Sequence, residues 1–416
     1  MPTTAEAISI VDGRPSPLAR VASRRGGRIV LLTELYPPAV GGSAVLFHGI
    51  YSRLDDADVT VVTPPATSRW GVIDPRGLAG HLRLAAQLRR QLPRRQGFVH
   101  CARALPEGVA AMMAQSLGGP GYVCWAHGED LASALTSREL TWLTKLVYRR
   151  STAALANSRN TAGMLTELGV PETKIHIVHP AVDADRFHPR VDGSAARRRL
   201  AADPNDVLLL SVGRLQRRKG HDVAIQAVAA LRSRCPNLRY VIAGDGDERL
   251  RLERLVAEHH LEDRVFFAGI VADADLPAFY AACDVFLLPN RVDDGDIEGF
   301  GIVFLEAAAS GRPVIGGDSG GVPEAVERDI TGLLVDGASV EAVADAIASL
   351  ATSDERRRRM GLAGRVRAQH CFSWQHAAAR VSDLQRRIVG RLRASGASAS
   401  PAQARDTDQR AQAGRA

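Results

Sequence analysis

The stretch from Val207 to Glu248, VLLLSVGRLQRRKGHDVAIQAVAALRSRCPNLRYVIAGDGDE, decides the fold. It begins with an apolar run, passes through a basic loop into a segment with helical periodicity, and ends in a second apolar run. Short apolar runs joined by a helix are typical of parallel strands that are covered on both faces. The stretch therefore predicts one strand–helix–strand unit of a parallel sheet.

The same alternation occurs in two series along the chain. In the first half, predicted strands lie at 28–33, 58–63, 97–102, 122–127 and 153–158. In the second half, they lie at 207–213, 239–246, 264–270, 284–290, 312–318 and 332–336. Segments with helical periodicity separate them, so the sequence predicts an α/β protein with two doubly wound, Rossmann-like domains that face each other across a cleft.

We place the first domain at residues 28–190 and the second at 207–372. The polar segment from His188 to Asp206 is expected to join them. A last amphipathic segment, 373–393, predicts a helix that crosses back and completes the first domain. Because ligands of doubly wound sheets bind at the carboxyl ends of the strands, a ligand is expected between the two domains.

The two ends of the chain, 1–27 and 394–416, are predicted to be disordered, since the first mixes Pro, Ser, Gly and Arg and the second lacks bulky apolar residues. Neither end reads as a secretion signal, and no apolar run approaches the ~18 residues of a membrane-spanning helix. The five cysteines have no C-x-x-C spacing, which argues against disulfides and zinc. We expect a cytoplasmic protein.

The formal charge of +7 lies in the first half of the chain. Residues 1–190 hold 22 Lys and Arg against 15 Asp and Glu, whereas residues 191–416 hold 31 of each. The segment 81–96 contains five arginines and no acidic residue. It is either a basic helix that lies on an anionic membrane or an ordinary helix with solvated arginines. No interleaved aromatic residues accompany this charge, so nucleic acid is not expected as a partner.

The basic loop after the strand at 207–213 is a candidate site for a diphosphate. Gly213 permits a tight turn, and Arg214 and Lys219 then place two cations near the start of a helix. A helix start offers free backbone N–H groups and positive potential, which anions prefer. The alternative is that these cations are solvated in a surface loop.

A second candidate motif is DIEGFGIVFLEAAASGRPVIGGDSGG, from Asp296 to Gly321. It sets Glu298 and Glu306 eight positions apart around the start of a helix, where glycines let a ligand approach the backbone. A buried carboxylate needs hydrogen-bond donors, and the hydroxyl groups of a sugar or ribose would supply them. Alternatively, the two glutamates are a helix-terminal carboxylate and a salt-bridge partner.

Taken together, the motifs GRLQRRKG, AGDGDE, FFAG, EGFGIVFLEAAASGRPVI and GGVPEAV have a family resemblance. The chain resembles the retaining nucleotide-sugar glycosyltransferases of family four, which have the GT-B fold and include the phosphatidylinositol mannosyltransferases. The resemblance covers roughly residues 28–390 and is most specific over 207–335. An ordered series of motifs is far more informative than one glycine fingerprint.

The resemblance implies roles for residues of the second half. Arg214 and Lys219 match the pair that binds the donor diphosphate. Glu298 matches the glutamate beside the hydroxyls of the donor sugar, and Glu306 matches the one that holds the ribose. Further donor contacts, mostly from the backbone, are implied for Gly213, Ile270, Val271, Phe300, Gly301, Ile302 and Val303.

In the first half, LYPPAVGGSAVL resembles the glycine loop of the family, which implies that Gly41 and Gly42 approach the donor phosphates. CWAHGED resembles the strand end that carries an active-site histidine, here His127. A simple turn and a structural histidine are the alternatives. RALPEG, from Arg103 to Gly108, also resembles family members without an assigned role. The run from His179 to Asp183 departs from the family pattern, which leaves the acceptor open.

The implied reaction moves a sugar, mannose from GDP-mannose, to a hydroxyl of a glycolipid or glycan in a bacterium, and keeps the α configuration. His127, Arg214, Lys219 and Glu298 would carry the catalysis without a metal, at the inner face of the plasma membrane if the basic helix binds lipid. Alternatives are a UDP-sugar donor, or an epimerase or hydrolase on the same fold. A non-catalytic sugar-binding module is disfavoured because the charged set is complete. A nicotinamide-dependent dehydrogenase is disfavoured because G-x-G-x-x-G is missing.

Overall fold

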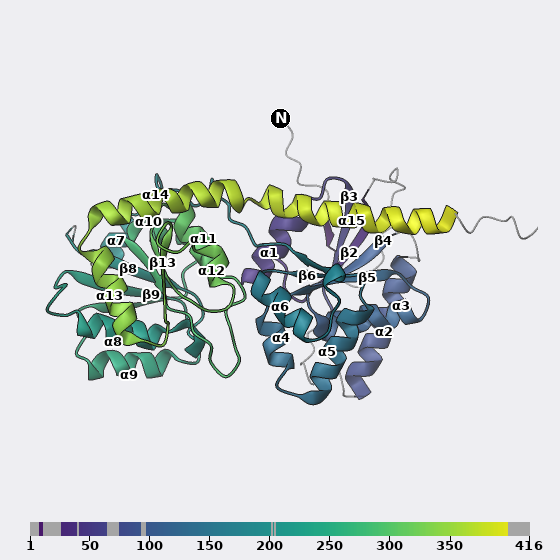
Figure 1. Ribbon diagram of the computed structural model, residues 1–416, viewed down its shortest axis with the longest axis horizontal. Helices are drawn as coiled ribbons and strands as arrows, with labels where there is room; N and C mark the ends of the chain where they lie inside the picture. The colour runs from purple at the N-terminus through teal and green to yellow at the C-terminus, as the bar shows by residue number, and fades with distance from the viewer. Residues whose placement is uncertain are drawn as a thin grey trace, which may run out of the picture.

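The computed structural model describes residues 8–10, 26–39, 41–64, 75–92, 97–200, 203 and 205–397. Two α/β domains lie side by side, and two consecutive long helices lie along the top of the molecule, one over each domain (Figure 1). Every strand pairing within the two sheets is parallel. The predicted fold class, two Rossmann-like domains of the GT-B type, is confirmed.

The N-terminal sheet has seven strands in the order β1-β3-β2-β4-β5-β6-β7. Their bounds are β1 (Ile8–Ile10), β2 (Gly27–Leu32), β3 (Ala57–Val62), β4 (Gly97–Cys101), β5 (Gly121–Ala126), β6 (Ala153–Ala156) and β7 (Ile175–Ile177). All residues of β4 and β6 are buried. Strands that are buried on both faces do not show the alternation of half-exposed strands, which is why they read as continuous apolar runs in the sequence.

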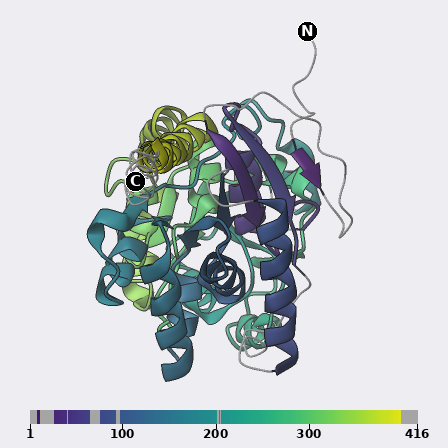
Figure 2. The same ribbon diagram turned by 90° about the vertical axis from the view of Figure 1, so that its right-hand side faces the viewer.

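Helices cover both faces of this sheet. One face packs against α2 (Pro75–Gln91), α3 (Val109–Ser116), α4 (Glu129–Ala134), α5 (Arg138–Arg150) and α6 (Arg159–Glu167). The other face packs against α1 (Gly42–Tyr51) and α15 (Trp374–Ala397). Figure 2 looks onto this domain and shows α15, in yellow, above the sheet and the blue and teal helices below it.

The C-terminal sheet has six strands in the order β10-β9-β8-β11-β12-β13. They are β8 (Val207–Val212), β9 (Leu238–Ala243), β10 (Val265–Gly269), β11 (Val285–Leu288), β12 (Val314–Gly317) and β13 (Gly332–Val335). One face packs against α8 (His221–Ala230), α9 (Arg249–Glu258) and α13 (Val340–Ala351). The other packs against α7 (Ser194–Arg199), α10 (Leu276–Ala282), α11 (Ile302–Ala309) and α14 (Asp354–Cys371).

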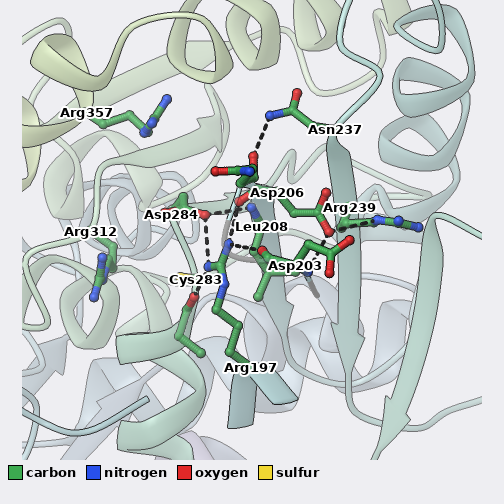
Figure 3. Close-up of polar contacts among 12 residues, drawn as sticks. Arg197, Asp203, Asp206, Leu208, Asn237, Arg239, Cys283, Asp284, Arg312 and Arg357 are labelled. Carbon is green, nitrogen blue, oxygen red and sulfur yellow. Dashed lines mark hydrogen bonds and ion pairs between the residues drawn. The ribbon is translucent and has the colours of Figure 1, made fainter. Parts of the chain in front are cut away.

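The segment expected to join the domains contributes helix α7 to the C-terminal domain. Within it, α7 packs on α10, and Arg197 of α7 donates to the carbonyl oxygen of Ala282 at 2.9 Å and to the Asp284 carboxylate at 3.2 Å. Asp284 also accepts from the backbone N–H of Leu208 at 2.8 Å (Figure 3). These contacts join residues about 80 positions apart, and local sequence pattern cannot predict them.

The predictions for the two chain ends need correction where the structure describes them. Ile8–Ile10, placed in a disordered segment 1–27, form edge strand β1, which pairs in parallel with Val59–Val61 of β3. An open sheet edge stabilises a short strand that has no core of its own to join. At the other end, α15 continues to Ala397, four residues past its predicted end at 393. Gly26 and Gly27, at the end of the predicted segment 1–27, are described as well, and Gly27 begins β2. The remaining residues of both predicted disordered ends lie outside the described part of the chain.

Helix α15 joins the two domains by packing on the first. It follows α14 of the C-terminal domain and lies against α1, and the two long helices form one band across Figure 1. Trp374, at its start, is buried, and its ring lies so close to Gly49 of α1 that a Cβ there would be 2.4 Å from the ring. Among the described helices, none combines the length and the apolar content that a bilayer crossing requires.

The packing of Trp374 predicts a large effect of its truncation. Trp374→Ala should lower the free energy of unfolding by about 3–5 kcal/mol, because a buried indole is lost and a cavity remains. Trp142→Ala is the matched control, because the side chain of Trp142 is 64% exposed and its loss should cost less than about 0.5 kcal/mol. Urea denaturation of both variants checks this. Equal losses in the two would contradict the packing role of Trp374.

Candidate active site

The predicted site residues come from the carboxyl ends of strands in both sheets. Gly42 begins α1 after β2, and His127 follows β5 directly. In the other domain, Gly213 follows β8, Ile270 follows β10, and Glu298 lies in the loop between β11 and α11. Since parallel strands end at a common edge, the residues of each domain gather at one edge of its sheet.

The two domains touch at Gly299, in the loop before α11. A Cβ on this residue would lie 1.9 Å from the carbonyl oxygen of His127, so only glycine permits the approach. The same carbonyl accepts a hydrogen bond from the Asn157 side chain at 3.1 Å. The glycine loop also approaches the start of α11. A Cβ on Gly42 would lie 3.9 Å from Cδ1 of Ile302, the first residue of that helix. The glycine loop, His127 and the Glu298 motif therefore meet at the domain junction.

Glu298 is the centre of the charged groups at this junction. Its Oε2 atom accepts from Nζ of Lys219, from Nη1 of Arg218 at 2.8 Å and from Nδ2 of Asn290 at 3.1 Å. The side chains of Glu298, Lys219 and Arg218 are only 12%, 10% and 7% exposed. Burial raises the pKa of the Glu298 carboxyl, but Lys219 and Arg218 outweigh it, so the pKa lies below its usual value. Glu298 therefore stays ionised and paired.

Arg218 is a residue that the sequence reasoning missed. Besides Glu298, it reaches Asp296 at 3.0 Å and, across the junction, Glu129 at the start of α4 at 3.4 Å. One guanidinium thus connects three carboxylates from two domains, and its planar fork of donors suits this role. Two features of the sequence could have indicated this role. Arg218 stands beside Lys219 in the basic run, and acidic residues follow His127 in the other domain.

Arg214 and Glu306 lie apart from this cluster. Arg214 is exposed, and no hydrogen bond or ion pair connects its side chain to any other part of the chain that the structure describes. Glu306, in the second turn of α11, accepts a hydrogen bond from the hydroxyl of Tyr280 at 2.7 Å. Burial raises the pKa of the Glu306 carboxyl by more than this hydrogen bond lowers it. Of the four charged residues, the structure brings only Lys219 and Glu298 into direct contact.

The start of α11 offers backbone groups rather than side chains. Gly301 is its N-cap with φ 86°, no side chain caps the helix, and its first turn has no acidic residue. Phe300 is buried against the rings of His179 and Phe372, so only its backbone can meet a ligand. Uncapped N–H groups at a helix start attract anions.

Two further predicted donor contacts, Ile270 and Val271, lie at the far edge of the C-terminal sheet. Ile270 follows β10 and its side chain is 80% exposed, whereas Val271 packs partly against the core beneath α10. Their backbone atoms are at the carboxyl end of β10.

His127 is held firmly as a neutral imidazole. Its Nε2 donates to the carbonyl oxygen of Ala102 at 2.9 Å, and its ring stacks on Trp125. Burial lowers the pKa of the imidazole, although the nearby Asp130 raises it. Since a carbonyl oxygen only accepts, Nε2 carries the proton, and Nδ1 is left as an acceptor.

The run from His179 to Asp183, which departs from the family pattern, lies at the domain junction. Nε2 of His179 is 2.7 Å from Oε2 of Glu324 in α12 (Val322–Ala325). The other oxygen of Glu324 accepts from the backbone N–H of Arg159 at 2.6 Å. Burial raises the pKa of Glu324, but the hydrogen bond from His179 and others outweigh it and lower the pKa. This run therefore helps to hold the domains together.

The motif RALPEG forms an irregular turn, Ala104–Gly108, in which Leu105 has extended backbone angles, and α3 follows it directly. Its Glu107 is 1% exposed and accepts a hydrogen bond from the backbone N–H of Glu34 at 3.4 Å. Burial raises the pKa of Glu107 to about 7. The role that the sequence left open is therefore, at least, to support the segment that precedes the glycine loop.

The described residues contain no group of three or more His, Cys, Asp or Glu side chains arranged to hold a metal ion. Within the acidic run Asp293–Asp296, Asp296 pairs with Arg218. The cations at the junction are protein side chains.

Comparisons with known proteins agree with this architecture. The model of the glycosyl transferases group 1 matches residues 193–367, and that of glycosyltransferase family 4 matches residues 18–186. A GDP-mannose-dependent alpha-(1-6)-phosphatidylinositol monomannoside mannosyltransferase of Mycobacterium tuberculosis is 32% identical over 381 residues, which cover 86% of this chain and 98% of that protein. The chain belongs to the family-four glycosyltransferases with the GT-B fold. It is a glycosyltransferase that resembles the phosphatidylinositol mannosyltransferases.

Other relatives and solved structures extend this picture. A D-inositol 3-phosphate glycosyltransferase of Corynebacterium glutamicum is 39% identical over 219 residues, 51% of each chain. The HepE protein of Anabaena in complex with UDP and glucose has a TM-score of 0.72 at 20% identity, covering 86% of this chain and 99% of that one. Sucrose-phosphate synthase of Thermosynechococcus elongatus has a TM-score of 0.73 at 22% identity, covering 88% and 99%. The last two likenesses concern the fold alone.

The buried Glu107 predicts a specific dependence of stability on pH. Its pKa rises from 4.5 to about 7 on folding, so its contribution to stability is fully present below pH 4.5 and is lost as the pH rises through 7. Glu107→Gln stays neutral at every pH. Relative to the wild type, the free energy of unfolding of this variant should rise by about 3 kcal/mol between pH 4.5 and pH 8.

Urea denaturation across this pH range measures the difference. Glu167→Gln, an exposed position at the end of α6, is the matched control and should show no comparable trend. A constant difference between Glu107→Gln and the wild type would refute the protonation of Glu107 in the folded protein.

Proposed function

We propose that this glycosyltransferase transfers mannose from GDP-mannose to a hydroxyl group of a glycolipid, with retention of the α configuration and without a metal. The observation that carries the proposal is the buried contact of Lys219 and Arg218 with Glu298 at the junction of the two domains. In this contact, two cations that could bind a diphosphate lie beside a carboxylate that could accept hydrogen bonds from sugar hydroxyls. The mycobacterial relative, named as GDP-mannose-dependent, supports the choice of donor.

The charged groups suit the departure of a nucleoside diphosphate. As the bond between the anomeric carbon and the phosphate oxygen breaks, negative charge builds on the diphosphate. Arg214, Lys219 and the uncapped start of α11 would stabilise it, because preorganised cations and N–H donors act most strongly in a water-poor site. Lys219 is now paired with Glu298, so the diphosphate would share this ammonium with the carboxylate.

Sugar hydroxyls would complete the coordination of Glu298. Its Oε2 already accepts three hydrogen bonds, whereas Oε1 has no partner among the described residues. Hydroxyl donors of the sugar would bind Oε1, and His127 would offer its Nδ1 or its backbone carbonyl from the other domain. Glu306 would hold the ribose with the oxygen that Tyr280 does not occupy.

Retention would follow from attack on the same face from which the diphosphate leaves. The acceptor oxygen forms a bond to the anomeric carbon while the carbon–phosphate oxygen bond breaks, and the hydroxyl proton passes to the leaving phosphate. Protein cations do here what a metal does in other transferases, so activity should persist in EDTA. The anomeric coupling constant of the product, measured by NMR, tests the stereochemistry.

A donor screen tests the central proposal. The melting temperature is measured with GDP-mannose, UDP-glucose, UDP-galactose and UDP-N-acetylglucosamine, and a ligand at a hundred times its Kd stabilises by about 2.7 kcal/mol. GDP-mannose should give the largest rise. A larger rise with a UDP-sugar would reject the mannose assignment and support a UDP-dependent transferase. Nucleotide release at full rate without an acceptor would instead support a hydrolase or epimerase.

The same assays on Lys219→Ala test the site. Turnover should fall by roughly 10²–10³-fold, the usual loss when one group that stabilises the charge of the transition state is removed. Arg358→Ala, a loss of the same charge at an 81% exposed position of α14, should leave turnover unchanged. Near-normal turnover of Lys219→Ala would reject this assignment.

Helix α2 supports peripheral contact with an anionic membrane. Ala85, Leu88 and Leu92 are buried against the domain, which agrees with an ordinary covering helix. On its outer side, however, Leu78 and Leu82 are 43% and 47% exposed, and Arg83, Arg89 and Arg90 are exposed as well. Exposed leucines beside arginines suit the surface of an anionic bilayer. Residues 93–96 of the basic segment lie outside the described part.

Flotation with liposomes tests this contact. The wild type should float with vesicles that contain an anionic phospholipid and should not float with neutral ones, whereas Arg89→Glu/Arg90→Glu should remain at the bottom in both. Arg358→Glu, which reverses one exposed charge in the other domain, is the control. Flotation of the double variant to the same extent as the wild type would exclude α2 as the contact.

A further inference from the structure

A cavity lies in the N-terminal domain, at the edge of the sheet opposite to the domain junction. It is bounded by the amino-terminal ends of β4, β5 and β6, by β7 and by the last turns of α15, and its volume is about 310 Å³. Binding sites for small molecules usually measure about 300–1,000 Å³. Because the predicted donor site uses the carboxyl ends of the strands, this cavity is separate from it.

The lining of the cavity combines an apolar floor with cations. Phe98 of β4 and Leu384 and Ile388 of α15 supply the apolar surface. His176 of β7 and Arg387 of α15 lie on the same cavity, together with Arg391, and none of its lining residues is acidic. Positive charge in a concave site attracts an anion.

The two arginines and the imidazole of His176 lie within electrostatic reach of one another. Burial lowers the pKa of the His176 imidazole, and Arg387 and Arg391 lower it further. Within the described chain, the guanidinium of Arg387 makes only a long hydrogen bond of 3.4 Å to the carbonyl oxygen of Asp383. It is therefore available to an anion, and a bidentate arginine suits a phosphate group.

We propose that this cavity binds an anionic amphiphile, a phosphate monoester that carries an alkyl group. The phosphate would bind Arg387, His176 and Arg391, and the alkyl group would lie on Phe98, Leu384 and Ile388. A neutral detergent would lack the charged contacts, and inorganic phosphate would lack the apolar ones. This site does not depend on the proposed donor or acceptor, because none of its residues belongs to the domain junction.

Isothermal titration calorimetry with octyl phosphate, inorganic phosphate and octyl glucoside tests the proposal on the full chain. Octyl phosphate should bind at least ten times more tightly than either of the others. Arg387→Glu should raise its Kd at least tenfold, and so should Gln115→Trp, which fills the cavity from the end of α3. Arg358→Glu, the same charge reversal on an exposed part of α14, should leave the Kd unchanged.

A Lys219→Ala variant separates this cavity from the domain junction, and its Kd for octyl phosphate should equal that of the wild type. A Kd raised tenfold in Lys219→Ala would place the ligand at the junction and overturn the proposal. Equal affinity for inorganic phosphate would overturn the amphiphile assignment. Binding that survives both Arg387→Glu and Gln115→Trp, or no binding at all, would overturn the cavity as its site.

Discussion

The neutralisation of Glu298 is the interaction on which the site depends. A carboxylate that is almost fully buried at a junction of two domains is costly unless cations pair with it. Lys219 and Arg218 do so from the loop after β8, and Arg218 extends the pairing to Glu129 of the other domain. The same ion pairs therefore keep a charged group inside the protein and connect the two domains.

Close backbone contact complements these charges. Gly299 allows the loop before α11 to reach the carbonyl oxygen of His127, so that a helix start of one domain and a strand end of the other share one space. On the far side, the packing of Trp374 of α15 on Gly49 ties the C-terminal half of the chain to the first sheet. Two domains that meet at a few points and share one helix can adjust their separation around a ligand while each core stays intact.

The fold and much of the site could be predicted because their signals are local. Apolar runs such as 207–213 mark buried parallel strands, and glycines beside Glu298 mark a helix start open to a ligand. The pairing of Arg218 could not be read in this way, since its partners lie up to about 90 positions away and in another domain. The same holds for strand β1 and for helix α7, whose contacts come from β3 and α10.

Sequence alone thus determined the two parallel sheets, most of their strands and the residue types at the strand ends, because hydrophobic periodicity and glycine placement act over a few residues. It did not predict strands β1 and β7 or helix α7. Only the tertiary structure decided which charges meet. In the folded protein, Lys219 forms an ion pair with Glu298, and Arg214 is exposed to solvent. Glu306 accepts a hydrogen bond from the hydroxyl of Tyr280. It also formed the basic cavity beneath α15. The physical reason is that ion pairs and cavities arise where distant segments pack, and neither leaves a periodic trace in the chain.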